Sequence, residues 1–163
     1  METLPLDEIM RHWEKDSNVD STEPGKEILR VPLLHNKYNK YLTLHTLSAR
    51  KCAFEYDKVK KLKWEYYTGK LDEDELQKLG WEPFRFVLKS DISVYIDGDD
   101  DLNKLKRKKS YHEETAKYCE NVMKELNART YQLRAFMDWE KFIQGARWCV
   151  MLRLKRLITS MRK

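Results

Sequence analysis

The sequence predicts a mainly helical fold with one small β-hairpin, an α+β class built from long helices. Two long segments show the alternating three- and four-residue spacing of side chains that is typical of one face of an α-helix. A shorter segment between them changes to a period of two, which is typical of strands. Of the 163 residues, 36% are charged, so much of the helix surface stays in water. We therefore expect self-association to complete the core.

The first long helix is predicted over residues 26–68. Pro32 falls early in it, where a missing amide proton is tolerated, and neither Pro nor Gly follows until Gly69. One stripe runs along the segment and contains Val31, His35, Tyr38, Leu42, His45, Ala49, Cys52, Tyr56 and Val59. So long a stripe needs a partner helix to cover it. A short amphipathic segment from Leu6 to Lys15 precedes this helix, and Pro24-Gly25 predicts a turn between the two.

Two smaller elements are expected next. An acidic short helix is predicted over 71–80, with Asp72 as its N-terminal cap and Gly80 as its end. A β-hairpin is predicted over 84–97, because apolar and polar side chains alternate there. An isolated hairpin is marginally stable in water, so we expect its strands to pair between subunits. The oligomer contact is accordingly assigned to Phe84, Phe86, Leu88, Ile92, Val94 and Ile96.

An aspartate-rich loop, Asp97-Gly-Asp-Asp-Asp101, follows the predicted hairpin. Carboxylates at this density occur in calcium loops and in magnesium-dependent nucleases. The Glu expected after the glycine of a calcium loop is missing, so a solvated turn is the preferred interpretation and no metal site is predicted.

A second long helix is predicted over 104–145, with Gly145 as its interruption. Five of its first six residues are basic, and the segment 147–163 contains six basic and no acidic residues. We interpret 1–146 as a single domain and 147–163 as a basic amphipathic C-terminal extension. This extension either packs as an ordinary terminal helix or serves as an adaptor for a protein partner, an anionic membrane or nucleic acid.

The segment from Lys58 to Lys70 is the candidate nucleic-acid-binding site. Between Lys26 and Lys70 there are 11 basic and 4 acidic residues, a local excess of positive charge. Lysines neutralise phosphates and aromatic rings stack on unpaired bases. The alternative is a solvated basic face above an ordinary core stripe. Trp64 and Tyr67 share a helix face and Tyr66 does not, so these rings cannot all stack on bases and fill the core. The predicted binding residues are Lys58, Lys60, Lys61, Lys63, Trp64, Tyr66 and Lys70.

Other functional classes find little support in the sequence. The three cysteines have no close pair, which disfavours a disulfide scaffold and a zinc site and favours reduced thiols. No apolar segment predicts secretion or membrane crossing, so a cytoplasmic protein is expected. Phosphate-binding glycine loops and metal-ligand spacings are missing as well. We therefore expect no catalytic residues and no cofactor.

Several motifs together resemble the UvsY family, the recombination mediator proteins of T4-type bacteriophages. The resemblance covers about residues 16–145, and its most specific part is the acidic-Tyr-Tyr-hydroxyl-Gly-basic series from Glu65 to Lys70. The matching motifs, in order, are Lys15-Asp16, Asp20-Ser-Thr22, Lys61 to Lys70, Val87-Leu-Lys-Ser-Asp91 and Val94-Tyr-Ile-Asp97.

This resemblance implies a non-enzymatic protein that forms a closed ring of about six or seven subunits, a symmetry common among homo-oligomers. It implies binding to single-stranded DNA and the loading of a UvsX-type recombinase onto strands covered by single-strand-binding protein. The family's DNA-binding positions fall on Lys61 and Lys63. No membrane partner is implied. The main alternative function is a basic helical adaptor that binds a protein partner or an anionic membrane surface without loading activity.

Overall fold

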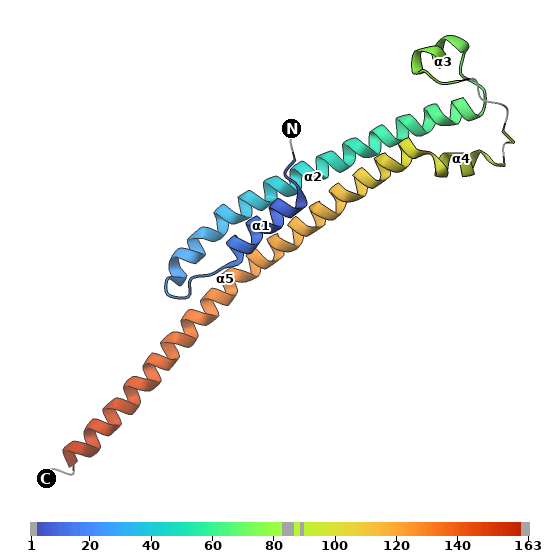
Figure 1. Cartoon of the computed structure of the whole chain (residues 1–163). Coiled ribbons are helices and arrows are strands. Elements are labelled where there is room, and N and C mark those ends of the chain that lie inside the picture. Colours follow the sequence, from blue (N-terminus) through green and yellow to red (C-terminus); the bar gives the residue numbers. More distant parts are fainter. Residues whose placement is uncertain (1–2, 83–86, 89, 161–163) are drawn as a thin grey trace. The chain divides into compact units, whose positions relative to one another are not determined.

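A computed structural model of the chain describes residues 3–82, 87–88 and 90–160. All regular secondary structure in these residues is helical (Figure 1). The helices are α1 (Leu6–Ser17), α2 (Pro24–Tyr67), α3 (Glu73–Leu79), α4 (Ile92–Gly98) and α5 (Asp100–Ser160). The chain divides into two compact units, to both of which α2 and α5 contribute. Unit 1 contains Thr3 and residues 40–119, and unit 2 contains residues 4–39 and the chain from 120 onward.

In unit 1, α2 and α5 lie side by side and run in opposite directions (Figure 1). His45 of α2 contacts His112 of α5, with 3.1 Å between their Nδ1 atoms. Farther along α2, Lys63 reaches Asp99, which directly precedes α5, with 2.8 Å between Nζ and Oδ2. Residue numbers thus rise along one helix as they fall along the other. The partner helix that the long stripe requires is supplied here by the chain itself.

The stripe predicted for the first long helix lies on the inner face of α2. Five of its members are buried, and the other four are of intermediate exposure. The buried five are Val31, Tyr38, His45, Ala49 and Cys52. The spacing rule therefore identified the face that packs, although it could not identify what packs against it.

In unit 2, polar contacts at the end of α1 link it to α2 and α5, beside buried apolar residues such as Ile9 and Leu126. Lys37 and Tyr38 of α2 donate hydrogen bonds of 2.7 and 3.0 Å to the Asp16 carboxylate. Arg129 of α5 donates to the main-chain oxygens of Asp16 and Ser17, at 3.0 and 3.3 Å, which satisfies carbonyls that a helix end leaves unpaired. Burial alone would raise the pKa of Asp16, but its hydrogen-bond donors outweigh burial and lower it.

The β-hairpin predicted over 84–97 is wrong, because its second strand is helix α4. Ile92 and Ile96 are four residues apart, a spacing that places two side chains on one face of a helix as well as on one face of a strand. Both are buried in a cluster with Leu102, whereas Val94 between them is 70% exposed. A period of two over five residues therefore does not distinguish a strand from a helix. Here the segment is a helix, and its buried side joins the core of unit 1.

The fold class is corrected accordingly, from α+β to all-helical in the part of the chain that the structure describes. Two of the six residues predicted to join subunits, Phe84 and Phe86, lie outside the described residues. Of the other four, two are buried in the α4 cluster, and Leu88 and Val94 are exposed. Pairing of strands between subunits therefore loses its basis.

The ends of the helices differ from their predicted positions by a few residues. The turn lies at Ser21-Thr22, and Pro24 is the first residue of α2, where a proline needs no amide proton. Helix α5 begins earlier than predicted because the Asp99 Oδ1 atom accepts hydrogen bonds from two amides of its first turn. It also continues through Gly145. No helix in residues 3–82, 87–88 and 90–160 is long and apolar enough to cross a membrane.

Candidate nucleic-acid interface

Six of the seven residues predicted to bind nucleic acid lie on the last turns of α2, but they do not share one face. An α-helix turns by about 100° per residue, so Lys61 and Lys63 point in nearly opposite directions, about 160° apart. Lys58 and Trp64 each lie about 60° from Lys61 and are on its side of the helix. The helix therefore divides the predicted site into two groups.

The first group forms the outer face, defined here as Lys58, Lys61, Trp64 and Lys70, all of which are exposed. The Lys61 side chain is 78% exposed and makes one loose ion pair with Glu65, at 3.7 Å. Exposed pairs of this kind contribute little to stability, so they compete weakly with a phosphate. The outer face thus presents cationic side chains that remain accessible to an anion.

Trp64 and Lys70 are arranged together on the outer face. The Lys70 ammonium lies 4.2 Å from the centre of the Trp64 ring, a cation–π contact. Trp64 remains 41% exposed, so part of its ring surface is free of protein contacts. An aromatic surface beside an ammonium group provides a stacking surface for a base and a charge for its phosphate. Lys60, also exposed, lies at the edge of this face.

The second group lies on the inner face, where Lys63 is an internal ion-pair partner. Its side chain is 12% exposed, and Nζ lies 2.8 Å from Asp99 and 3.2 Å from Asp101. Nζ also lies 4.5 Å from the centre of the Trp81 ring. Burial alone would lower the pKa of Lys63, but the hydrogen bonds and charges of the two aspartates outweigh it and raise the pKa. The charge of this lysine is therefore already balanced within unit 1.

Tyr66 also faces the protein. Its hydroxyl donates a 2.8 Å hydrogen bond to the main-chain oxygen of Glu82, and its ring lies 4.9 Å from that of Trp81. Tyr67 donates to Asp99 at 3.3 Å, with its ring against Tyr95. Of the three aromatic residues considered from the sequence, Trp64 is thus the exposed one. Tyr66 thus holds the segment after α2 against the end of that helix, and Tyr67 holds α4 and the start of α5 against it.

A comparison with models of known protein families shows to which family the chain belongs. A family model described as "Recombination, repair and ssDNA binding protein UvsY" matches residues 12–146, most of the sequence. The chain belongs to the UvsY family. The resemblance of the sequence motifs to this family is thereby confirmed.

Solved structures of a UvsY protein have the same fold as this chain. One crystal structure of the bacteriophage T4 recombination mediator protein UvsY has a TM-score of 0.75 at 18% identity, and the match covers 87% of this chain and 99% of the T4 protein. A second has a TM-score of 0.71 at 15% identity and covers 85% and 98% of the two chains. At such identity the likeness concerns the fold alone. A search of curated proteins found no match in sequence.

The segment Glu65 to Lys70, the most specific part of the sequence resemblance, ends helix α2. Gly69 has a positive φ of 67°, which suits glycine. The amides of Gly69 and Lys70 donate to the carbonyls of Tyr66 and Glu65, at 3.1 and 2.9 Å, the double hydrogen bond of a Schellman ending. Thr68 donates its hydroxyl to the Trp64 carbonyl at 2.8 Å. This ending stops the helix and places Lys70 beside the last turn, where its ammonium lies over the Trp64 ring.

The sequence prediction missed one residue, Phe54, that adjoins these four and is counted with the outer face from here on. Phe54 is 69% exposed and lies one turn before Lys58 on the same side of α2. The signal was present in the sequence, because Phe54 falls outside the predicted core stripe that includes Cys52 and Tyr56. An aromatic residue off the core stripe, four residues from a lysine, adds a second ring to the face that carries Trp64.

The aspartate-rich segment 97–101 is not the solvated turn that was predicted, because Asp97 and Gly98 end α4, Asp100 and Asp101 begin α5, and Asp99 between the helices is buried. Asp99 caps α5 and pairs with Lys63, and Asp101 also pairs with Lys63. No group of three potential metal ligands converges among the residues that the structure describes. The junction of α4 and α5 therefore acts as a structural anchor for the inner face of α2.

Proposed function

We propose that this chain is a non-enzymatic recombination mediator that binds single-stranded DNA in the cytoplasm of the host cell. It helps to load a UvsX-type recombinase onto DNA covered by single-strand-binding protein, in homologous recombination and in recombination-dependent replication and repair. The observation that carries this proposal is the exposed outer face of α2, which combines lysines with Trp64 and Phe54 in a chain of the UvsY family.

The outer face suits DNA binding without sequence preference. Ammonium groups such as Lys58 and Lys61 act as point charges for phosphates and lack the planar fork of a guanidinium. Contacts to phosphates carry no sequence information. Trp64 and Phe54 offer ring surfaces to any base. A mediator must bind every sequence that the recombinase will use, so charge and stacking are sufficient for recognition.

We propose that the remaining predicted residues, Lys63 and Tyr66, support the site from within. Both contact the segments that hold the end of α2, Lys63 through Asp99 and Tyr66 through Glu82. They are positioning residues in this proposal, and Lys58, Lys60, Lys61, Trp64 and Lys70 contact the strand.

Self-association is part of the proposed mechanism. Large aromatic side chains are exposed on the part of α5 that belongs to unit 2: Tyr131 at 73%, Trp139 at 58%, Phe142 at 67% and Trp148 at 63%. Tyr131 and Phe142 lie within about 20° of each other around the helix, and Trp139 lies about 60° from Phe142. Tyr131, Trp139 and Phe142 thus share one face, whereas Trp148 lies about 180° from Trp139 and is not part of it. An exposed apolar face of this kind favours a protein contact. We propose that it joins copies of this chain into a ring, in place of the predicted hairpin.

A ring would multiply weak contacts along one strand. Each outer face contributes a few electrostatic and stacking contacts, and binding to one subunit raises the effective concentration of the strand at the next. Such contacts break one after another as a recombinase filament advances. Release therefore does not require the loss of a single deep site.

The test of this function has two arms. In the first, fluorescence anisotropy with labelled oligo-dT and with a duplex of equal length measures preference for single strands, and we expect tighter binding to oligo-dT that weakens with salt. In the second, the DNA-dependent ATPase activity of a UvsX-type recombinase is measured on strands covered by single-strand-binding protein. We expect the chain to shorten the lag before the ATPase activity of the recombinase reaches its steady rate. If the chain binds oligo-dT but does not shorten this lag, the proposed role in loading the recombinase is wrong.

The oligomer contact is tested by native mass measurement of Trp139→Glu/Phe142→Glu beside Val94→Asp. We expect the α5 variant to fall to smaller species because two charges enter an apolar contact. Val94→Asp serves as the control and should keep the mass of the wild type. Dissociation by Val94→Asp alone would return the contact to the region around α4.

A further inference from the structure

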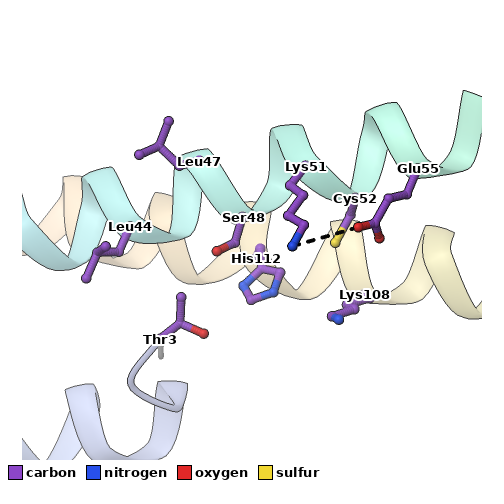
Figure 2. A pocket seen from close by; sticks show the side chains of 9 residues that line it. All are labelled: Thr3, Leu44, Leu47, Ser48, Lys51, Cys52, Glu55, Lys108 and His112. Carbon is purple, nitrogen blue, oxygen red and sulfur yellow. Dashed lines mark ion pairs between the residues drawn. The ribbon is translucent and has the colours of Figure 1, made fainter. Parts of the chain in front are cut away.

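Unit 1 contains a cavity of about 320 Å³ whose lining is polar on one side. Figure 2 shows Ser48, Lys51 and Glu55 reaching it from α2, and Lys108 and His112 from α5. Its volume lies within the range of small-molecule sites and exceeds what one phosphate group needs. A phosphate together with its sugar fits a space of this size.

The charged groups at the cavity leave an excess of positive charge. Lys51 is 78% exposed and lies 3.9 Å from Glu55, the one carboxylate among the lining residues. Lys108 is exposed and makes no ion pair with any residue that the structure describes. Two ammonium groups and a serine hydroxyl thus face one carboxylate. This combination of donors is typical of phosphate contacts in nucleic-acid-binding proteins.

His112 lines the inner part of the same cavity. It is 6% exposed, and its Nδ1 atom lies 3.1 Å from that of His45, so one ring donates a hydrogen bond and the other accepts it. Burial lowers the pKa of His112, and the charges of His45 and Lys108 lower it further. His112 is therefore neutral near pH 7, and the lysines supply the positive charge. An anion placed beside Lys108 would offset part of this repulsion.

The cavity continues the line of the outer face along α2. Lys51 and Lys58 are seven residues apart, which places them about 10 Å apart along the helix axis and within about 20° around it. Phe54 lies between them and is exposed. A strand that contacts Lys61 and Lys58 and passes over Phe54 arrives at Lys51.

We propose that this cavity binds a backbone phosphate of the single strand that the outer face holds, with Lys51, Lys108 and Ser48 as its contacts. The assignment rests on the proposed DNA-binding function and extends it to residues outside the segment from Lys58 to Lys70. It gives each protomer a second binding position on α2, beside the first turns of α5.

The first experiment compares two single-charge variants on the same helix. Lys108 and Lys117 are nine residues apart and lie about 180° apart around α5, so Lys117→Gln is a matched control for Lys108→Gln. The salt dependence of oligo-dT binding is measured by anisotropy. Each phosphate contact to a single strand contributes about 0.7 to the slope of log K against log salt. We expect Lys108→Gln to lower the slope by about this amount and Lys117→Gln to leave it unchanged.

Glu55→Gln provides a test of opposite sign. It removes the carboxylate from the cavity and frees Lys51 from its ion pair, so we expect oligo-dT binding to tighten by about two- to fivefold, the range of one exposed pair. Equal slopes for Lys108→Gln and Lys117→Gln, or no tightening in Glu55→Gln, would overturn the assignment. Failure of the wild-type chain to bind oligo-dT would instead overturn the proposed function itself.

The second experiment follows the His112 ring by NMR, in two arms. Titration with oligo-dT is expected to raise the pKa of His112, because a phosphate beside Lys108 screens its charge. Titration with inorganic phosphate tests whether the cavity takes the free anion. If His112 responds to inorganic phosphate and not to oligo-dT, the cavity binds a free anion, and the proposal that it binds a backbone phosphate of the strand is wrong. A response to neither would exclude phosphate binding.

Discussion

Lys61 and Lys63 lie two residues apart in α2, and the structure gives them opposite surroundings. The side chain of Lys61 is 78% exposed with one loose ion pair, whereas that of Lys63 is 12% exposed between Asp99 and Asp101. The inner face holds the end of α2 in place, and the outer face keeps its charge available. A run of lysines in a sequence therefore does not by itself describe one surface, because the helix distributes it over two.

The difference between the two faces is tested most strongly by Lys63→Met, which keeps an unbranched side chain of nearly the same length and removes its charge. Two aspartates then lose their common partner, and loss of one member of a buried pair costs about 3 kcal/mol or more. We expect the free energy of unfolding, measured by urea denaturation, to fall by about this amount.

Lys61→Met is the matched control for this variant. An exposed ion pair contributes less than about 1 kcal/mol, so its stability should remain close to that of the wild type. If both variants lose the same free energy of unfolding, Lys63 contributes no more to stability than Lys61, and the inner face is not the anchored one.

Acid should weaken the inner face and leave the outer face unaffected. Burial alone would raise the pKa of Asp99, but hydrogen bonds from Lys63 and from the α5 amides outweigh burial and lower it. The stabilising contribution is complete above about pH 4 and is lost as the pH falls through the lower pKa of the folded state.

We expect this loss to be smaller than that caused by Lys63→Met, because a protonated Asp99 can still accept hydrogen bonds at the start of α5. Urea denaturation between pH 5 and pH 2.5 measures it, in steps that bracket the carboxyl titration. Lys63→Met should show a shallower decline over this interval than the wild type. If the free energy of unfolding falls equally with pH in Lys63→Met and in the wild type, the acid effect does not depend on the ion pair between Asp99 and Lys63.

On the outer face, Trp64→Ala should weaken oligo-dT binding by about 1–3 kcal/mol, the contribution of one base stacked on an aromatic ring. Fluorescence anisotropy at fixed salt gives this value. Trp64→Phe keeps a ring and should recover most of the affinity. Quenching of tryptophan fluorescence by oligo-dT in the wild type, lost in Trp64→Phe, would locate the contact. If Trp64→Ala does not change the affinity, no base stacks on Trp64, and the outer face binds the strand through charge.

Apart from the control Lys61→Met, the smallest expected effect is that of Tyr66→Phe. This variant removes the hydroxyl that donates to Glu82 and keeps the ring beside Trp81, so it should cost about 1 kcal/mol of stability. DNA affinity of the folded protein should not change. A loss of affinity without a loss of stability would move Tyr66 to the group that contacts the strand.

Much of the helical architecture was predictable, because side chains such as Tyr38 and Cys52 repeat at helical spacing over many turns. The hairpin prediction failed where the window was short, since Ile92 and Ile96 satisfy the strand and helix patterns equally well. The difference between Lys61 and Lys63 was not predictable from residue type. It depends on Asp99, 36 positions later than Lys63, which the fold brings to the inner face of α2.

The central claim is that the outer face, and not the inner one, contacts the phosphates of a single strand. The salt dependence of oligo-dT binding tests it directly in Lys58→Ala/Lys61→Ala and in Lys63→Met, each verified to be folded by circular dichroism. We predict that the double variant lowers the slope by about 1.4, two contacts at about 0.7 each, and that Lys63→Met leaves it unchanged. An unchanged slope in the double variant, or a lower slope in Lys63→Met, would contradict the account.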